Sequence, residues 1–220
     1  MKTIRVRDTT EEISVGKILC LGRNYVEHAK EMGADIPTHP VVFIKPSTAI
    51  IHAGEEIVIP SISHEMHHEV ELVVAIAGNG KNIPASQASK YILGYGVGLD
   101  MTLRDLQNEA KKQGLPWSVA KGFDTSAPVS DFVPPHLIEK PSELEIRCTV
   151  NGVVRQHSRV DRMIFSVEDT LSFISRLFTF ERGDLVFMGT PEGVGPVHAG
   201  DLITVELIQY ETITHPVRSA

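Results

Sequence analysis

Short apolar runs separated by glycine and proline make up most of the chain, a pattern typical of strands rather than of long helices. Runs of β-branched and apolar residues bounded by such breaks predict β-strands. After a short leading strand and turn that ends near Lys17, we predict strands at residues 18–21, 41–44, 56–59, 68–76, 91–99, 185–188 and 202–208.

A hairpin gives the clearest local signal. Residues 145–150 and 153–156 read as two strands on either side of Asn151-Gly152. Asn-Gly favours the two positive φ angles of a type I′ turn. We therefore predict that these two segments pair as antiparallel neighbours.

Two helices are predicted from residues that favour helix ends. Asn24 can cap a short helix that continues through Met32. Thr102-Leu103-Arg104-Asp105 has the spacing of a capping box, with Asp in place of Glu. It predicts a helix that runs to Gln113 and is terminated by Gly114.

Two further helices are expected on the outside of the sheets. One is short, at residues 85–90, and the other is capped by Ser166 and ends near Phe178. The apolar residues of the second helix recur at helical spacing and are predicted to pack in the core. They are Val167, Leu171, Ile174, Leu177 and Phe178.

The order of these elements predicts the fold class. Strands and helices do not alternate at the spacing of βαβ units, and the sequence has no internal repeat. We predict an α+β, strand-dominated protein with a folded-over mixed sheet, a roll or barrel, and a few peripheral helices. Gly94-x-Gly96 lacks the third glycine of a dinucleotide loop, since Leu99 stands there, and no P-loop motif occurs.

Composition narrows the class of partner and the compartment. The 220 residues fit one domain, with 1–17 as a short lead-in and 18–220 as a single catalytic domain. The net charge of -7 and the absence of a Lys/Arg-rich run argue against nucleic acid. We expect no membrane span, no signal peptide and a cytoplasmic protein, in which Cys20 and Cys148 are reduced core residues.

Two glutamates in an apolar strand are the first candidates for chemistry. In the strand at 68–76, Glu69 and Glu71 point to the same face because strand side chains alternate. Like charges this close repel unless one is protonated or a cation lies between them. Asp100 closes another apolar run, and three oxygen ligands at strand ends suit Mg²⁺ or Mn²⁺. The alternative is that the glutamates face solvent on an edge strand.

Several polar residues could act around such a metal. His28 and Glu31 lie three residues apart on one helical face, where a carboxylate could orient a general base. The alternative is an ordinary exposed helix pair. Arg104 and Gln107 share a face of the helix after Asp100 and could hold a substrate carboxylate, as could Arg23.

Two more candidates come from a lysine and from a rigid loop. Lys121 lies in a mostly apolar segment, so it needs either an anionic partner or, as the alternative, a place on the surface. The Gly/Pro-rich loop at 189–196 could bring backbone close to a ligand, with the Thr190 hydroxyl as a donor. Taken alone, that loop is only a tight turn.

Taken together, four motifs resemble those of the fumarylacetoacetate hydrolase family, and most closely its short branch of acylpyruvate hydrolases and oxaloacetate decarboxylases. The resemblance runs in order from about Lys17 to Val205. The motifs are His-His-Glu-Val-Glu-Leu at 67–72, Gly-Tyr-Gly-Val-Gly-Leu-Asp-Met-Thr-x-Arg-Asp-x-Gln at 94–107, Trp-x-x-Ala-Lys-x-Phe-Asp at 117–124 and Gly-Thr-Pro-x-Gly-Val-Gly-Pro at 189–196.

The resemblance implies a mixed β-roll, a homodimer, and Mg²⁺ or Mn²⁺ held by Glu69, Glu71 and Asp100. It also implies a catalytic His–Glu dyad at His28 and Glu31 and an active-site lysine at Lys121. The expected reaction is hydrolysis of the C–C bond of a β-diketo acid of the acylpyruvate or fumarylpyruvate type, through an enolate that the metal stabilises. Oxaloacetate decarboxylation and 2-oxo acid tautomerisation would use the same site, and a non-catalytic binder of oxo acids is a further alternative.

Overall fold

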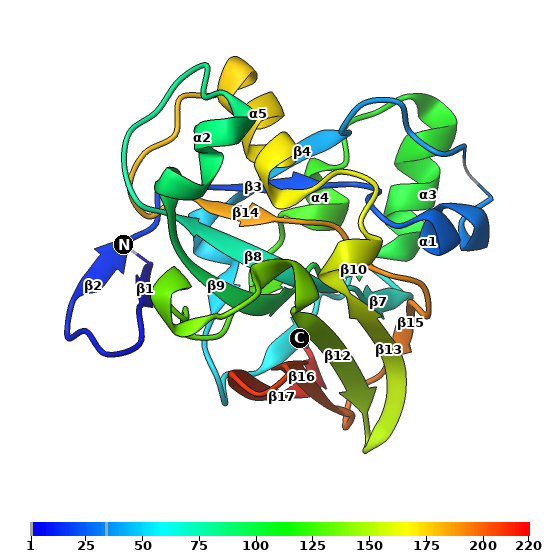
Figure 1. The fold of residues 1–220 in the computed structure, drawn as a ribbon. Helices are drawn as coiled ribbons and strands as arrows, with labels where there is room; N and C mark the ends of the chain where they lie inside the picture. The colour runs from blue at the N-terminus through cyan, green and yellow to red at the C-terminus, as the bar shows by residue number, and fades with distance from the viewer. Residues whose placement is uncertain (1, 34) are drawn as a thin grey trace.

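The centre of the structure is the apolar strand that contains Glu71, observed as β8 (Val70–Ile76), in which every residue is buried. The computed structural model describes residues 2–33 and 35–220 (Figure 1). β8 lies in a mixed five-stranded sheet with the order β4-β3-β14-β8-β9. Its other strands are β4 (Val42–Pro46), β3 (Lys17–Leu21), β14 (Leu185–Phe187) and β9 (Ile92–Leu99).

The two faces of β8 contact different parts of the core. Val70, Leu72, Val74 and Ile76 belong to a large apolar cluster, whereas Val73 and Ala75 belong to a second, smaller one. This alternation places Glu71 on the face of Val73 and Ala75. Glu71 therefore lies in a strand that is buried on both faces, and its carboxylate is shielded from solvent.

A second five-stranded sheet packs beside the first, because its strands β12 and β16 contact β8 and β9. Its order is β13-β12-β16-β17-β6, antiparallel except for the parallel pair of β17 and β6. The strands are β13 (Val153–Arg159), β12 (Glu145–Val150), β16 (Leu202–Leu207), β17 (Glu211–Ser219) and β6 (Ile57–Ile59).

Three smaller sheets complete the strand content. They pair β10 (Thr102–Leu103) and β15 (Gly195–Val197) with β7 (Met66–His68), β11 (Ala127–Pro128) with β5 (Ile50–Ile51), and β1 (Thr3–Arg5) with β2 (Glu12–Ser14). The predicted strand-dominated α+β class is confirmed, and the sheets are mixed. Over the described residues they do not close into a barrel.

The helices lie around the sheets (Figure 1). They are α1 (Val26–Glu31), α2 (Ala85–Ala88), α3 (Arg104–Gln113), α4 (Ser118–Lys121) and α5 (Val167–Leu177). Short 3-10 turns occupy Ser47–Ala49, Ser89–Tyr91, Pro135–Leu137, Pro141–Glu143 and Val160–Arg162. Among the described residues, no helix has the length and apolar character needed to cross a bilayer.

Several local predictions are confirmed. Asn151 and Gly152 have φ angles of 52° and 77°, as the predicted turn between β12 and β13 requires. The Ser166 hydroxyl accepts a hydrogen bond from the Asp169 amide and caps α5. Gly114, with φ 67°, ends α3. Cys20 and Cys148 are both buried and unpaired.

Two predicted caps are wrong, and the reason in each case is a tertiary contact. The Asn24 side chain does not cap α1; its amide donates to the carbonyls of Phe165 and Met188, and its oxygen accepts from the Phe165 amide. Thr102 does not open α3, because it lies in β10, which pairs with β7, and its hydroxyl accepts a hydrogen bond of 2.7 Å from the Lys121 ammonium. Both side chains bridge segments that only the folded chain brings together.

One further expectation fails, and one long strand is not predicted. Leu177 was expected in the core, but it lies in the last turn of α5 and is 56% exposed. The long C-terminal strand β17 has no counterpart among the predicted strands. Its pattern of alternating burial includes His215 and Pro216, which interrupt the apolar signal in the sequence.

The glycines of the Gly-Tyr-Gly-Val-Gly run serve packing rather than phosphate binding. Residues 127–133 cross β9 closely, and the Tyr95 amide donates to the Val133 carbonyl at 2.9 Å. A Cβ atom at Gly98 would lie 2.8 Å from the Pro128 carbonyl oxygen and 2.9 Å from a methyl group of Val73. Glycine is therefore required at this position by the space that is left.

We predict that Gly98→Ala destabilises the protein by roughly 1–3 kcal/mol, because a methyl group forced into a packed core displaces its neighbours. Urea unfolding followed by far-ultraviolet circular dichroism measures this. Gly78→Ala is the matched control, since nothing lies within 4 Å of a Cβ atom there. Equal stability of the two variants would show that the close crossing of β9 is not a packing constraint.

Candidate active site

Three buried carboxylates meet where β8 and β9 begin and end. Glu71 pairs with Gly98 across the two strands, and the Asp100 amide donates to the Glu69 carbonyl at 2.8 Å. One carboxylate oxygen from each of Glu69, Glu71 and Asp100 lies within 4.8 Å of the others. The predicted continuous strand at 68–76 is wrong at Glu69, which lies in the break between β7 and β8, but its carboxylate still converges with that of Glu71. Asp100, directly after β9, supplies the third carboxylate.

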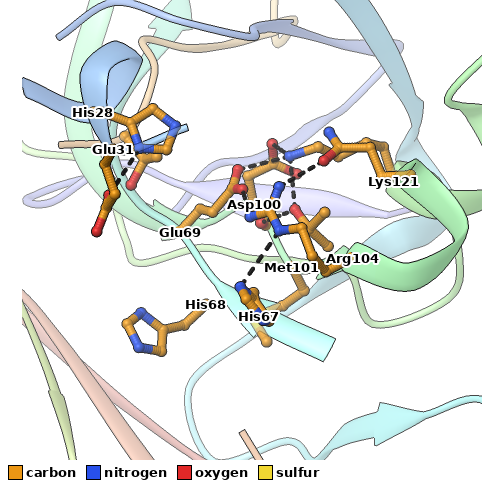
Figure 2. Close-up of polar contacts among 12 residues, drawn as sticks. His28, Glu31, His67, His68, Glu69, Asp100, Met101, Arg104 and Lys121 are labelled. Carbon is orange, nitrogen blue, oxygen red and sulfur yellow. Dashed lines mark hydrogen bonds and ion pairs between the residues drawn. The ribbon is translucent and has the colours of Figure 1, made fainter. Parts of the chain in front are cut away.

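Cationic side chains lie directly against this cluster (Figure 2). Lys121, at the end of α4, places its ammonium 2.7 Å from Glu69 Oε2 and 2.5 Å from Asp100 Oδ2. It also donates to the Thr102 hydroxyl at 2.7 Å. Arg104 pairs with the other oxygen of Glu69. Lys121 is therefore a buried, paired lysine and not a surface residue.

Glu71 is the carboxylate with no basic side chain against it among the described residues. It accepts a hydrogen bond of 2.6 Å from the Gly189 amide. Burial, and then the neighbouring Asp100 carboxylate, raise the pKa of Glu71 well above its usual value. Burial also raises the pKa of Glu69, but Lys121 and Arg104 outweigh it and hold that pKa below its usual value. The pKa values of the two glutamates are therefore shifted in opposite directions, because only Glu69 has basic side chains beside it.

Gly189 can donate to Glu71 because of its unusual backbone. Its φ is 90°, and a Cβ atom there would lie 2.7 Å from the Cβ of Asn24. Only glycine combines that backbone angle with so close an approach. The Gly/Pro-rich loop thus contributes a backbone amide to the carboxylate cluster.

The cluster has the donor set and the free lone pairs that a hard divalent cation needs. Three carboxylates are the ligands that Mg²⁺ and Mn²⁺ prefer in proteins. Asp100 Oδ1 is buried and accepts no hydrogen bond from any described residue. The Lys45 ammonium lies 2.7 Å from it as an ion pair, but its hydrogen bonds go to the carbonyls of Met101, Lys121 and Ser126. The residues present fit a metal ion.

A cavity of about 280 Å³ opens beside the cluster. Of the residues predicted from sequence, it is lined by Arg23, His28, Glu69, Arg104, Gln107 and Lys121. Gly22, Met32, Lys111 and Trp117 complete the lining. The wall is contributed by α1, α3 and α4 together, so the cavity depends on the packing of these three helices.

His28 and Glu31 form the contact that their spacing suggested. His28 Nδ1 lies 3.4 Å from Glu31 Oε2, and the imidazole is buried while the Glu31 side chain is 36% exposed (Figure 2). Both oxygens of Glu31 also lie 3.2 Å from the Gly193 amide. Burial lowers the pKa of His28, so the imidazole is neutral at pH 7 and can accept a proton.

Thr190 and Glu31 are the predicted catalytic and substrate-binding residues that do not line the cavity. The Thr190 hydroxyl accepts a hydrogen bond of 2.8 Å from the Gln156 side chain. Gln156 in turn accepts from the Val70 amide at 3.0 Å and contacts His68 Nδ1 at 2.9 Å. The described contacts of Thr190 therefore tie the 189–196 loop to the start of β8.

Sequence reasoning missed Lys45 and Gln156. Lys45 follows the apolar run of β4 and precedes Pro46, so it reads as the end of a strand, yet its side chain is fully buried. A lysine directly after an apolar strand in a chain with clustered carboxylates was the available signal. For Gln156, an exposed-looking position in a hairpin strand, the sequence holds no comparable sign.

The fold and this carboxylate site define a family. The family model described as fumarylacetoacetate (FAA) hydrolase C-terminal matches residues 17–218. The chain therefore belongs to the fumarylacetoacetate hydrolase family. Its relatives are named as a hydrolase, an isomerase and an oxaloacetate tautomerase.

Individual relatives cover nearly the whole chain. The mitochondrial oxaloacetate tautomerase FAHD1 of Mus musculus is 46% identical over 186 residues, 84% of each protein. The structure of fumarylpyruvate hydrolase from Pseudomonas aeruginosa in complex with Mn²⁺ and pyruvate is 38% identical, with a TM-score of 0.95 over 100% of this chain and 96% of that one. A 5-carboxymethyl-2-hydroxymuconate delta-isomerase from Mycobacterium smegmatis is also 38% identical, with a TM-score of 0.83 over 94% of this chain and 80% of that one.

We predict that replacing the two glutamates changes the stability of the metal-free protein by different amounts. Glu69→Gln is expected to destabilise it by about 3 kcal/mol, because Lys121 and Arg104 lose a buried partner. Glu71→Gln is expected to stay within about 1 kcal/mol of the wild type, since no basic side chain depends on Glu71 and Gln can still accept from the Gly189 amide. Urea unfolding in EDTA measures both variants.

The same variants are then titrated with Mn²⁺ by calorimetry, and both are expected to bind it more weakly than the wild type. Equal destabilisation of the two metal-free variants would contradict the electrostatic difference between Glu69 and Glu71. Unchanged Mn²⁺ affinity in either variant would remove that glutamate from the metal site.

Proposed function

We propose that this chain is a divalent-metal-dependent enzyme that hydrolyses the C–C bond of a β-diketo acid of the acylpyruvate or fumarylpyruvate type. The observation that carries the proposal is that a neutral, carboxylate-oriented imidazole and one carboxylate of the cluster, Glu69, line the same cavity. His28 and Glu69 both line it. A base for water beside a cation site is the combination that hydrolysis requires and that binding alone does not.

The metal would be held by Glu69, Glu71 and Asp100. When bound, Mg²⁺ or Mn²⁺ would polarise the carbonyl oxygens of the substrate and stabilise negative charge that develops on them. The Mn²⁺ in the related fumarylpyruvate hydrolase supports this assignment. The convergence of the three buried carboxylates and the absence of a basic side chain against Glu71 among the described residues support it from this chain's own residues.

His28 would act as the general base. A proton on Nδ1, shared with Glu31, leaves Nε2 free to take a proton from water. The resulting hydroxide attacks the carbonyl carbon distal to the carboxylate. The C–C bond then breaks, its electron pair leaves with the pyruvate fragment as an enolate, and the other fragment departs as a carboxylic acid. Transfer of the proton that His28 took from water to the enolate carbon then gives pyruvate and restores the neutral imidazole.

The remaining cavity residues would bind and orient the substrate. Arg104 donates to the Gln107 side chain at 2.6 Å, and both line the cavity with Arg23. The Lys121 ammonium keeps its charge: burial lowers its pKa, but Asp100 and Glu69 outweigh burial and raise it. A permanently charged ammonium at the inner end of the cavity would stabilise the enolate. The role of Thr190 as a hydroxyl donor stays a prediction.

Oxaloacetate chemistry is the second candidate. Identity of 46% to an oxaloacetate tautomerase over most of both chains favours it. Tautomerisation needs only a proton transfer, and decarboxylation needs no attacking water, so neither requires the His28–Glu31 dyad for water activation. A non-catalytic binder of oxo acids is disfavoured because binding has no use for that dyad. The homodimer and the cytoplasmic location expected from the sequence stay predictions.

We predict that His28→Ala lowers the kcat/KM for acetylpyruvate hydrolysis by about 100-fold or more, since it removes the general base. Oxaloacetate decarboxylation is expected to fall much less. Loss of enol absorbance follows acetylpyruvate, and pyruvate release follows oxaloacetate, each with Mg²⁺ and after EDTA. His136→Ala is the matched control, because His136 is exposed and does not line the cavity.

Equal losses in the two assays would count against His28 as the water-activating base. Full activity of the wild type after EDTA treatment would overturn the metal dependence. Turnover of oxaloacetate but not of acetylpyruvate by the wild type would favour the second candidate over the first.

A further inference from the structure

The backbone of the 189–196 loop contacts two carboxylates that have separate tasks in the proposed reaction. The Gly189 amide donates to Glu71 at 2.6 Å, and the Gly193 amide lies 3.2 Å from both carboxylate oxygens of Glu31. Glu71 belongs to the carboxylate cluster, and Glu31 belongs to the histidine dyad. A displacement of this one loop would therefore change the surroundings of both carboxylates.

A single buried side chain from the second five-stranded sheet holds the loop between those two glycines. Gln156, in β13, is 1% exposed. Its amide nitrogen donates to the Thr190 hydroxyl at 2.8 Å and to the Pro191 carbonyl at 2.9 Å. Its amide oxygen accepts from the Val70 amide at 3.0 Å and contacts His68 Nδ1 at 2.9 Å. The side-chain amide thus uses both of its donors and both lone pairs of its oxygen.

The backbone partners fix which way this side-chain amide faces. A peptide N–H only donates and a peptide carbonyl only accepts, so the oxygen of Gln156 faces Val70 and its nitrogen faces Pro191. The same orientation makes His68 Nδ1 the donor in its contact with Gln156. The loop and the start of β8 are therefore joined in one fixed arrangement.

A β-bulge turns Gln156 inward. Gln156 pairs with Cys148 of β12. The next pair of the ladder joins Thr149 to Val154, so that Arg155 is an extra residue in β13. Bulges re-aim side chains in this way, and Gln156 is buried although the residues on both sides of it are exposed.

The bulge meets the loop a second time, at Gly193. This glycine has a φ of 91°, and a Cβ atom there would overlap the Arg155 carbonyl oxygen and lie 3.4 Å from Cγ of Gln156. The loop therefore packs directly on the bulged segment of β13, and the Gln156 side chain binds it two and three residues before Gly193.

We infer that Gln156 is a positioning residue for the reaction. Through the 189–196 loop it holds the Gly189 amide against Glu71 and the Gly193 amide against Glu31. Gln156 does not line the cavity, so it acts through the loop and not by contact with substrate. The inference rests on the proposed function in taking Glu71 as a metal ligand and Glu31 as the partner of the general base.

Nuclear magnetic resonance of the metal-free protein tests the positioning without turnover. Amide protons that donate to carboxylates resonate downfield, so the Gly189 and Gly193 amides report the two contacts. Both resonances are expected to move upfield in Gln156→Met, which removes all four contacts of the side-chain amide. They are also expected to move in Gln156→Glu, a milder variant that keeps the acceptor for Val70 and loses the donor to Pro191.

Ile4→Val is the matched control for a general loss of packing. Ile4 is buried in β1, which lies on the opposite side of the view from β13 and β15 (Figure 1). Both glycine resonances are expected to stay in place in this variant.

Metal binding and a double-mutant cycle measure the consequence for the site. Gln156→Met is expected to weaken Mn²⁺ binding in calorimetry by about 10-fold, as loss of a residue that orients a metal ligand typically does. At saturating Mn²⁺, the kcat/KM for acetylpyruvate hydrolysis is expected to fall more than that for oxaloacetate decarboxylation, because only hydrolysis needs the dyad. In a Glu31→Ala background, Gln156→Met is expected to add little further loss of hydrolysis.

Unmoved Gly189 and Gly193 resonances in both Gln156 variants would overturn the inference. Losses of hydrolysis that multiply in the Glu31→Ala background would also overturn it, because a residue that only stabilises the fold acts independently of Glu31. If the wild type hydrolyses no acylpyruvate, the proposed hydrolysis fails while the two resonances and the Mn²⁺ affinity still decide the role of Gln156. If hydrolysis occurs and the resonances do not move, only the role of Gln156 fails.

Discussion

Burial of three carboxylates in one apolar region is the constraint on which the rest of this structure depends. Removing a carboxylate from water is costly unless cations and hydrogen-bond donors replace the water. Asp100 has the ammonium groups of Lys45 and Lys121 within 2.7 Å and 2.5 Å, and Glu69 has Lys121 and Arg104. Glu71 has a single backbone donor. The three basic side chains all lie against Glu69 and Asp100, so Glu71 is left without a cation, and a divalent ion bound among the carboxylates would place positive charge beside it.

Close packing of β9 against its neighbours positions the three carboxylates. β9 can lie beside β8 and under residues 127–133 only because its glycines leave room for backbone atoms. That arrangement sets Gly98 opposite Glu71 and brings Asp100 next to Glu69. β9 leads through β10 into α3 and α4, which carry Arg104 and Lys121 back to the carboxylates. The close packing of β9 therefore also determines where the carboxylates of the site lie.

Much of this could be predicted from the sequence, because the signals were local. The convergence of the Glu69 and Glu71 carboxylates, the Asn-Gly turn and the Ser166 cap each depend on neighbouring residues, and all three are observed. Asn24 and Thr102 also carry cap-like signals, but their side chains bind residues far away in the sequence, Met188 and Lys121. Lys45 and Gln156 gain their roles from residues 34 or more positions away, such as Asp100 and Thr190, so no local pattern could reveal them. The identity of the substrate is a further step removed, because it depends on which charges remain unpaired in the cavity.

The central claim is that a divalent ion joins Glu69, Glu71 and Asp100, and X-ray diffraction from crystals grown with Mn²⁺ tests it most directly. Data collected near the Mn absorption edge locate the ion independently of any assumed function. We expect one strong anomalous peak within about 2.3 Å of an oxygen from each of the three carboxylates, the distance range of hard-cation–oxygen bonds. We also expect the Lys121 ammonium to withdraw from at least one of them. No anomalous peak among these carboxylates at saturating Mn²⁺, with Lys121 still bridging Glu69 and Asp100, would contradict the claim.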